Sequence, residues 1–176
     1  MCIRDRTEEA LALFREMGDK ERVAWSLSTL GLLDTQEGKY ASARALYEES
    51  RAIHSELGDK RGIAITLLRL AQLLFVSEGD QAELRSLLEE GLALFKELGE
   101  KEGIANSYAL SGQLALSQGD TTTARLRLEE SIMLYRQIGH RKALAESLAI
   151  LARVVMAQGE RAAEQVIYEE RLAIAR

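Results

Sequence analysis

Two histidines are the side chains of this sequence best suited to bind a metal ion or to transfer protons near neutral pH. His54 occupies a position that is aromatic elsewhere in the chain, at Phe14, Phe95 and Tyr135. His140 falls instead in a short segment that follows a glycine and precedes a helical pattern. Neither histidine has a second ligand at helical spacing, and a metal site needs several converging ligands. We therefore predict structural roles for both histidines and no metal site.

Adjacent glutamates are the second group that could support chemistry. General acid–base catalysis needs two carboxylates that face one substrate from different environments. Neighbouring residues on a helix point in different directions, so a Glu-Glu pair does not face one substrate. The regular recurrence indicates a solvated ridge, with an acidic docking stripe as the alternative. The pairs are Glu8-Glu9, Glu48-Glu49, Glu89-Glu90, Glu129-Glu130 and Glu169-Glu170.

Other kinds of chemistry have little support in the sequence. The glycines do not form a phosphate-binding motif, and no nucleophile elbow or cysteine–histidine pairing is present. Cys2 is the only cysteine, which leaves no disulfide framework. The net charge of -5 argues against binding to a nucleic-acid backbone. No apolar run approaches membrane-spanning length. We predict a cytoplasmic protein that is not an enzyme, with no catalytic residue and no cofactor.

The composition predicts an all-α fold. The chain has 176 residues, of which 47% are hydrophobic, and it contains no proline. Ala, Leu, Glu, Arg and Gln dominate, and these are strong helix formers. The alternation of apolar and polar residues that marks a strand is missing.

Glycines divide this helical sequence into repeats. One set recurs about every 40 residues and a second set lies roughly midway between its members, a period typical of helical arrays. Each glycine ends an amphipathic segment, where a left-handed backbone conformation favours glycine. Acidic residues that suit a helix start often follow. The repeat unit is therefore helix A, turn, helix B, turn. The first set is Gly18, Gly58, Gly99 and Gly139, and the second is Gly38, Gly79, Gly119 and Gly159.

The two helices of a unit have complementary faces. Helix A carries a large residue, a second large residue three positions later and then a small one, which places bulk and a gap on one face. The gap allows helix B to approach closely. One hairpin cannot bury both its faces, so neighbouring hairpins must stack. The small residues are Gly31, Ala71, Gly112 and Ala152, and the helix B positions facing them are Ala43 and Tyr47, Leu84 and Leu88, Ala124 and Leu128, and Glu164 and Tyr168.

The stretch LGLLDTQEGKYASARALYEES, from Leu30 to Ser50, resembles the tetratricopeptide repeat. The resemblance implies a right-handed α-solenoid of stacked antiparallel helix hairpins. HEAT repeats have a similar period, but the Leu-Gly and Ala-to-aromatic spacing favours the tetratricopeptide family. The period exceeds the usual 34 residues. The chain therefore resembles the long-turn variety, of about 40 residues, found in large bacterial regulators.

The register divides the chain into a half repeat and four repeats. The half repeat is 7–17 and the repeats are 18–57, 58–98, 99–138 and 139–176. Residues 1–6 do not fit, and we expect them to be disordered or an artefact joined to a fragment of a longer protein. The step from Ala71 to Gly79 is one residue longer than the step from Gly31 to Gly38. Either a π-bulge near Phe75 or a longer turn would accommodate the extra residue.

The resemblance also implies that helix A lines a concave surface that binds a protein or peptide. The register then gives a partner-binding groove. Trp25 is its largest side chain, and the alternative is that Trp25 only packs against the next repeat. The inner positions carry no lysine, which disfavours the clamp that some family members use for a terminal carboxylate. The groove residues are Trp25, Ser28, Leu32, Ile65, Leu68, Gln72, Phe75, Asn106, Gln113 and Arg153.

These features predict a protein- or peptide-binding scaffold within a larger signalling or transcription-regulatory protein. A peptide-sensing receptor domain is the main alternative, and an enzyme is a disfavoured one. Partners would be proteins or peptides, and neither nucleic acid nor membrane is expected. Uncapped apolar ends would also allow end-to-end self-association of the isolated chain.

Overall fold

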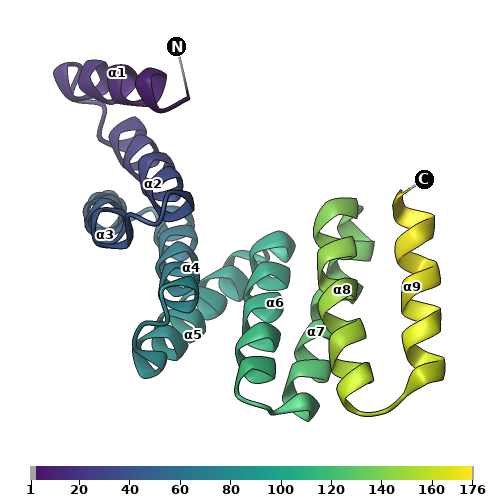
Figure 1. Ribbon diagram of the computed structural model, residues 1–176. Coiled ribbons are helices and arrows are strands. Elements are labelled where there is room, and N and C mark those ends of the chain that lie inside the picture. Colours follow the sequence, from purple (N-terminus) through teal and green to yellow (C-terminus); the bar gives the residue numbers. More distant parts are fainter. Residues whose placement is uncertain (1–2, 176) are drawn as a thin grey trace. The chain divides into compact units, whose positions relative to one another are not determined.

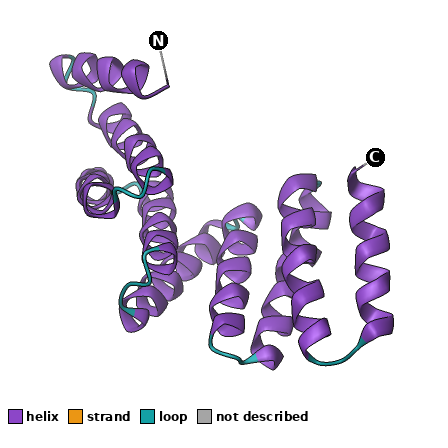
Figure 2. Cartoon of the chain, in the orientation of Figure 1, coloured by secondary structure: helices purple, strands orange, loops and turns teal. Residues whose placement is uncertain are grey.

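A computed structural model describes residues 3–175 of the chain. These residues form nine α-helices and no strand (Figure 2). The predicted all-α class is therefore confirmed. The helices are α1 (Ile3–Glu16), α2 (Lys20–Gln36), α3 (Tyr40–Leu57), α4 (Lys60–Val76), α5 (Gln81–Leu98), α6 (Lys101–Ser117), α7 (Thr121–Ile138), α8 (Arg141–Ala157) and α9 (Arg161–Ala175).

The helices belong to two compact units, Met1–Leu94 and Phe95–Arg176. In the first unit, α2 packs against α1, α3 and α4. In the second unit, α6 packs on α7, α7 on α8 and α8 on α9, and short turns connect these helices (Figure 1). Helix A of one hairpin also contacts helix A of the next, since α2 touches α4 and α6 touches α8. Each unit is thus built from antiparallel helix hairpins stacked side by side.

Small residues on helix A allow helix B to approach, as the sequence predicts. A Cβ placed on Gly31 would lie 2.7 Å from Cε1 of Tyr47. In the second unit, a Cβ on Gly112 would lie 2.7 Å from Cγ of Leu128. Both facing side chains are almost completely buried. The Gly-to-large contact therefore fixes the distance between the two helices of a hairpin.

Seven of the eight glycines that divide the chain into repeats have positive φ, as expected for helix ends. Gly79 is the exception, and the prediction for it was wrong. Glu78 takes the left-handed position there, with φ of 52°. The N–H of Gly79 then donates to the Leu74 carbonyl oxygen, as the N–H of Lys39 donates to that of Asp34. The seven glycines are Gly18, Gly38, Gly58, Gly99, Gly119, Gly139 and Gly159.

The extra residue of the second repeat lengthens the turn rather than the helix. The helix α4 is α-helical throughout, with no π-bulge, and has the same 17 residues as α2. One residue more separates Glu78 from the first residue of α5 than separates Gly38 from the first residue of α3. Asp80 fills the added space and accepts hydrogen bonds from the N–H groups of Ala82 and Glu83.

Residues 3–6 form the first turn of α1. Arg4 is the residue that ties this turn to α2. Its Nη2 lies 2.7 Å from Oδ1 of Asp34 and 2.9 Å from Oε1 of Glu37. Asp34 is buried and also accepts a hydrogen bond from the hydroxyl of Ser42. Met1 and Cys2, which belong to the same predicted segment, lie outside the described residues.

Candidate functional site

Trp25 is the largest side chain of the predicted groove, and the structure leaves it half-buried on α2. Its ring meets the ring of His54 edge-on, with the centroids 4.9 Å apart. Part of its surface therefore packs against α3, the second helix of the same repeat. The rest borders two hollows in the surface of the first unit. Phe14 and Arg22 line one of them, and Leu57 and Arg61 line the other.

The remaining groove residues of the first unit lie on α2 and α4, two helices in contact with each other. Leu32 on α2 and Ile65, Gln72 and Phe75 on α4 are partly exposed. Two further predicted residues are buried, since Ser28 is 6% exposed and Leu68 7% exposed. Ser28 and Leu68 therefore lie beneath the surface, whereas Trp25 and the four partly exposed residues can contact a ligand.

In the second unit the predicted residues have more polar surroundings. The hydroxyl of Tyr135 donates a hydrogen bond of 2.5 Å to Oδ1 of Asn106, which joins α7 to α6. Gln113 on α6 is partly exposed, and Arg153 on α8 is exposed. The oxygen of Asn106 is thus already engaged inside the unit. This bond fixes the orientation of its side-chain amide.

Tyr108 lies on α6 at the position where the other repeats carry a large core residue. It is aligned with the fully buried Leu27, Leu67 and Leu148, yet it is half-buried. Nζ of Lys96 lies 5.4 Å from its ring centroid and the guanidinium carbon of Arg127 lies 5.3 Å away. Cations within about 6 Å of an aromatic face are attracted to it. Two cations of the same unit therefore lie over the ring of Tyr108. In the sequence, the only sign of this is that a tyrosine stands where the aligned repeats have leucine.

His54 has the structural role that the sequence predicts. It is fully buried, and its ring lies against Gly62, where a Cβ would collide with Nδ1. Nδ1 lies 2.9 Å from Oδ2 of Asp59. This contact does not have the direction of a hydrogen bond, so the short distance alone does not make it one. The same contact between a helix B aromatic and the start of helix A recurs where Phe95 meets Gly103.

His140 and the glutamate pairs also have structural partners. Nδ1 of His140 accepts a hydrogen bond of 3.3 Å from the N–H of Ala143, which caps α8. The paired glutamates are exposed or half-exposed on helix B, and several form ion pairs with arginines. Because arginines neutralise much of the ridge, it carries less negative potential than its glutamates suggest. The ion pairs include Arg15–Glu49, Arg44–Glu48, Arg125–Glu129, Arg127–Glu130 and Arg136–Glu170.

The described residues hold neither a cluster of metal ligands nor a membrane-spanning helix. No group of three or more His, Cys, Asp or Glu side chains lies close enough together there to hold a metal ion. None of the helices in the described part of the chain combines the length and apolar character needed to cross a membrane.

Residues 22–97 match the family model described as tetratricopeptide repeat. This segment therefore resembles tetratricopeptide repeats. It covers α3, α4 and most of α2 and α5, so the Gly31–Tyr47 contact lies within it. No curated protein matches the chain.

Solved structures agree with the tetratricopeptide fold. The crystal structure of BtubC (BKLC) from P. vanneervenii has a TM-score of 0.79 at 19% sequence identity, covering 97% of this chain and 73% of that one. The Q17M crystal structure of a Podosopora anserina putative kinesin light chain with nearly identical TPR-like repeats has a TM-score of 0.69 at 20% identity. It covers 97% of this chain and 84% of that chain. At these identities the likeness concerns the fold alone.

Proposed function

We propose that this chain is a scaffold that binds a protein or peptide on the helix A surface of its repeats. Tetratricopeptide repeats are generally protein-binding scaffolds, which makes this class of function the first to consider. The observation that carries the proposal is the half-buried Trp25, which borders two surface hollows. Aromatic side chains of this kind often act as anchors at protein interfaces.

The ligand surface in the first unit is formed by Trp25 with Leu32, Ile65, Gln72 and Phe75. Its apolar side chains favour an amphipathic helix or an extended peptide with apolar anchors. Gln72 adds an amide that can pair with a peptide backbone or a polar side chain. The second unit would offer a surface of its own, with polar groups and one positive charge from Asn106, Gln113 and Arg153.

A peptide library displayed on phage, selected against the full chain, provides the test. Selected peptides should bind the variants Leu32→Glu and Gln72→Arg at least tenfold more weakly, because each places a charge on the proposed surface. Neither substitution touches the Trp25–His54 contact. Ala45→Glu is the matched control, since Ala45 is exposed on α3. Peptides that bind all three variants equally would show that the ligand surface lies elsewhere.

The wider role proposed here is a docking arm in a signalling or transcription-regulatory protein of the cytoplasm, with repeats of the long-turn variety. The coding sequence on both sides of this segment tests that role. An adjoining DNA-binding or nucleotide-binding module would support it. A frame that holds only further repeats and caps would contradict it and indicate a free-standing adaptor.

A peptide-sensing receptor is the second candidate, since the same surface could close on a short signalling peptide. Small-angle scattering distinguishes the two. A change in the radius of gyration when a selected peptide binds favours the receptor, and an unchanged radius favours the scaffold. An enzyme has less support, because His54, His140 and many of the paired glutamates already have structural contacts.

End-to-end self-association of the isolated chain remains a separate proposal. Exposed apolar side chains on α9, such as Val166 and Leu172, would favour it. Light scattering at increasing concentration tests it, and a strictly monomeric mass would reject it.

A further inference from the structure

The hollow that α2 and the start of α4 form beside Trp25 combines an aromatic ring with charged side chains. Its volume is about 460 Å³, which lies within the usual range for ligand pockets. Glu21 and Trp25 are four positions apart, so they share one face of α2. The hollow is lined by Glu21 and Trp25 of α2, Leu57 of α3, and Asp59 and Arg61 at the start of α4.

The same positions recur in the second unit, in the middle of the chain. All of them are exposed or partly exposed there, although α6 has helices before and after it in the sequence. The exposure of these positions therefore belongs to the repeat and does not depend on where the chain begins. The corresponding residues of the second unit are Glu102, Asn106, Ile138, His140 and Lys142.

The two units differ in the charges that these positions carry. In the second unit, Nε2 of His140 lies 3.7 Å from Oε1 of Glu102. Nδ1 of His140 accepts the N–H of Ala143, so Nε2 carries the ring proton beside the carboxylate. In the first unit, the same two positions hold Glu21 and Asp59. A carboxylate thus has a proton donor beside it in the second unit, whereas the first unit has a second carboxylate at that position.

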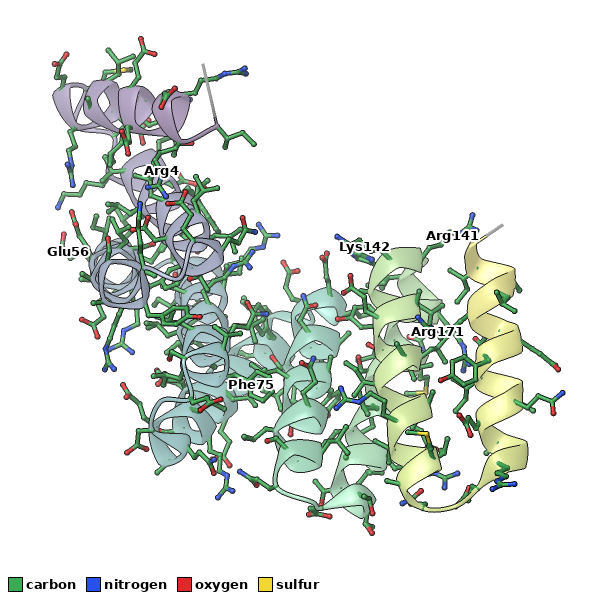
Figure 3. All side chains as sticks on the ribbon, in the orientation of Figure 1. Arg4, Glu56, Phe75, Arg141, Lys142 and Arg171 are labelled. Atoms are coloured by element: carbon green, nitrogen blue, oxygen red, sulfur yellow. The ribbon has the colours of Figure 1, made fainter. Side chains whose placement is uncertain are left out.

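The chain compensates these two carboxylates only in part. Lys20, next to Glu21 on α2, is engaged with Glu56 of α3 (Figure 3), where Nζ and Oε2 are 2.8 Å apart. Arg61 borders the hollow itself. Glu21, Asp59 and Arg61 together leave one negative charge, which a single basic side chain of a ligand would balance.

A buried histidine lies behind the hollow. His54 is fully buried, and neither ring nitrogen has a hydrogen-bond partner among the described residues. Its ring meets Trp25 edge-on, and its Nδ1 lies 2.9 Å from Oδ2 of Asp59. The other carboxylate oxygen of Asp59 accepts the N–H of Gly62. Buried polar groups nearly always have hydrogen-bond partners, so an unpaired histidine against two lining residues indicates a position shaped for more than packing.

We propose that the hollow binds one lysine or arginine side chain of the protein or peptide held by the scaffold surface. This inference rests on the proposed function, in which Trp25 is the anchor, and it adds the chemistry of one ligand residue. The cation would lie between the carboxylates of Glu21 and Asp59. The indole ring of Trp25 would attract the same cation, and the alkyl stem of the ligand side chain would pack on the exposed Leu57.

Acetylated and amidated peptides of the sequence Ala-Leu-X-Leu-Ala, with arginine, lysine, glutamine or glutamate at X, serve as probes of the full chain. Trp25 is the only tryptophan, so its indole N–H gives a single resonance in an isotope-labelled sample. The arginine and lysine peptides should shift this resonance saturably and bind about fivefold more tightly than the other two, or better. Raising the salt concentration should weaken the binding of the two basic peptides.

Substitutions of the two carboxylates test their role directly. Glu21→Gln and Asp59→Asn each remove one charge, and asparagine keeps the helix cap. Each should weaken binding of the arginine peptide about fivefold. Glu21→Lys should reverse the preference, so that the glutamate peptide binds best. Glu102→Gln, at the same position of the second unit, is the matched control and should change the affinity by less than about twofold. Circular dichroism of each variant shows whether the fold is kept.

Equal affinities for the four peptides, or equal weakening by Glu102→Gln and Glu21→Gln, would reject the hollow as a site for a basic side chain. A shift of the Trp25 resonance by magnesium or calcium chloride alone, lost in Glu21→Gln, would assign the hollow to a metal ion instead. Library-selected peptides that bind Leu32→Glu weakly but Glu21→Gln normally would support the scaffold surface and contradict this inference. Probe binding that needs Glu21, with selected peptides indifferent to Leu32→Glu, would contradict the scaffold surface instead.

Discussion

Gly31 on α2 lies so close to Tyr47 on α3 that an added methyl group would come within 2.7 Å of the tyrosine ring. In the next repeat, helix A has Ala71 at the same position and helix B has Leu88 in place of the tyrosine. The larger helix B residue thus accompanies the smaller helix A residue. The volumes are matched in these two hairpins, whereas the third pairs Gly112 with Leu128 and the fourth pairs Ala152 with Tyr168.

Gly31→Ala should therefore destabilise the chain. Overpacking a core costs about 1–3 kcal/mol, and the helix propensity of alanine returns about 1 kcal/mol of this. We expect a net loss of up to about 2 kcal/mol in the free energy of unfolding, measured with urea. Gly31→Ala should lower the free energy of unfolding less in a Tyr47→Leu background than it does in the wild-type chain. Gly91→Ala is the control, because its Cβ would meet neighbours at an ordinary 3.4 Å. Equal losses in both alanine variants would refute the matching of volumes.

Glu78 holds the left-handed backbone position at which seven other turns have glycine. A residue with a Cβ is strained there, so Glu78→Gly should stabilise the chain by about 0.5–1 kcal/mol. Gly38→Ala makes the opposite change at the equivalent position of the preceding repeat and should destabilise by about 1 kcal/mol. Thermal unfolding of both variants checks the pair. A lower melting temperature for Glu78→Gly would show that the glutamate side chain makes a stabilising contact.

The sequence predicted the helices and their contacts well because both depend on local patterns. The small residue opposite a large one, at Gly31 and Tyr47, is visible in the spacing alone. Gly79 was assigned wrongly because the turn has one extra residue and Glu78, rather than the glycine, takes the left-handed position, which glycine content does not reveal. Longer-range effects were also missed, such as the two cations on Tyr108, because they depend on three different helices.

The candidate site was predictable only as a set of register positions. In the structure, Trp25 and Leu32 are partly exposed, whereas Ser28 and Leu68 are buried. Exposure depends on how neighbouring hairpins stack, which one repeat period does not specify. The hollow that α2 and the start of α4 form beside Trp25 required the structure as well, since it depends on how α2 stacks on α4.

The ion pair between Arg4 and Asp34 leads to a separate prediction about α1. Asp34 is buried, so removing its partner leaves a carboxylate with less compensation for lost solvent. Arg4→Met should speed the hydrogen exchange of α1 amides, because the charge that ties α1 to α2 is lost. The amides of α8, in the other unit, should exchange at unchanged rates. Arg6→Met is the matched control on the same helix, and an equal effect there would show that Arg4 has no special role.

The buried hydroxyl of Tyr135 predicts a dependence of stability on pH. Burial raises the pKa of Tyr135 to about 12, against an ordinary value of 10.0. The unfolded chain therefore loses this proton at lower pH than the folded chain does. The associated stability is fully present below about pH 10 and is lost as the pH rises toward 12. Two pH units correspond to about 2–3 kcal/mol.

Tyr135→Phe separates this effect from packing. At pH 7 the variant should be less stable by about 1 kcal/mol, because the oxygen of Asn106 loses its donor. Between pH 10 and 12 the wild type should lose stability faster, so the difference should shrink and then reverse. Part of the alkaline loss should remain in the variant, since burial also raises the pKa of Tyr47. Urea unfolding at pH 7, 9, 10 and 11 measures the difference, with the exposed Tyr168→Phe as control. Parallel curves for wild type and Tyr135→Phe would mean that ionisation of this hydroxyl does not drive alkaline unfolding.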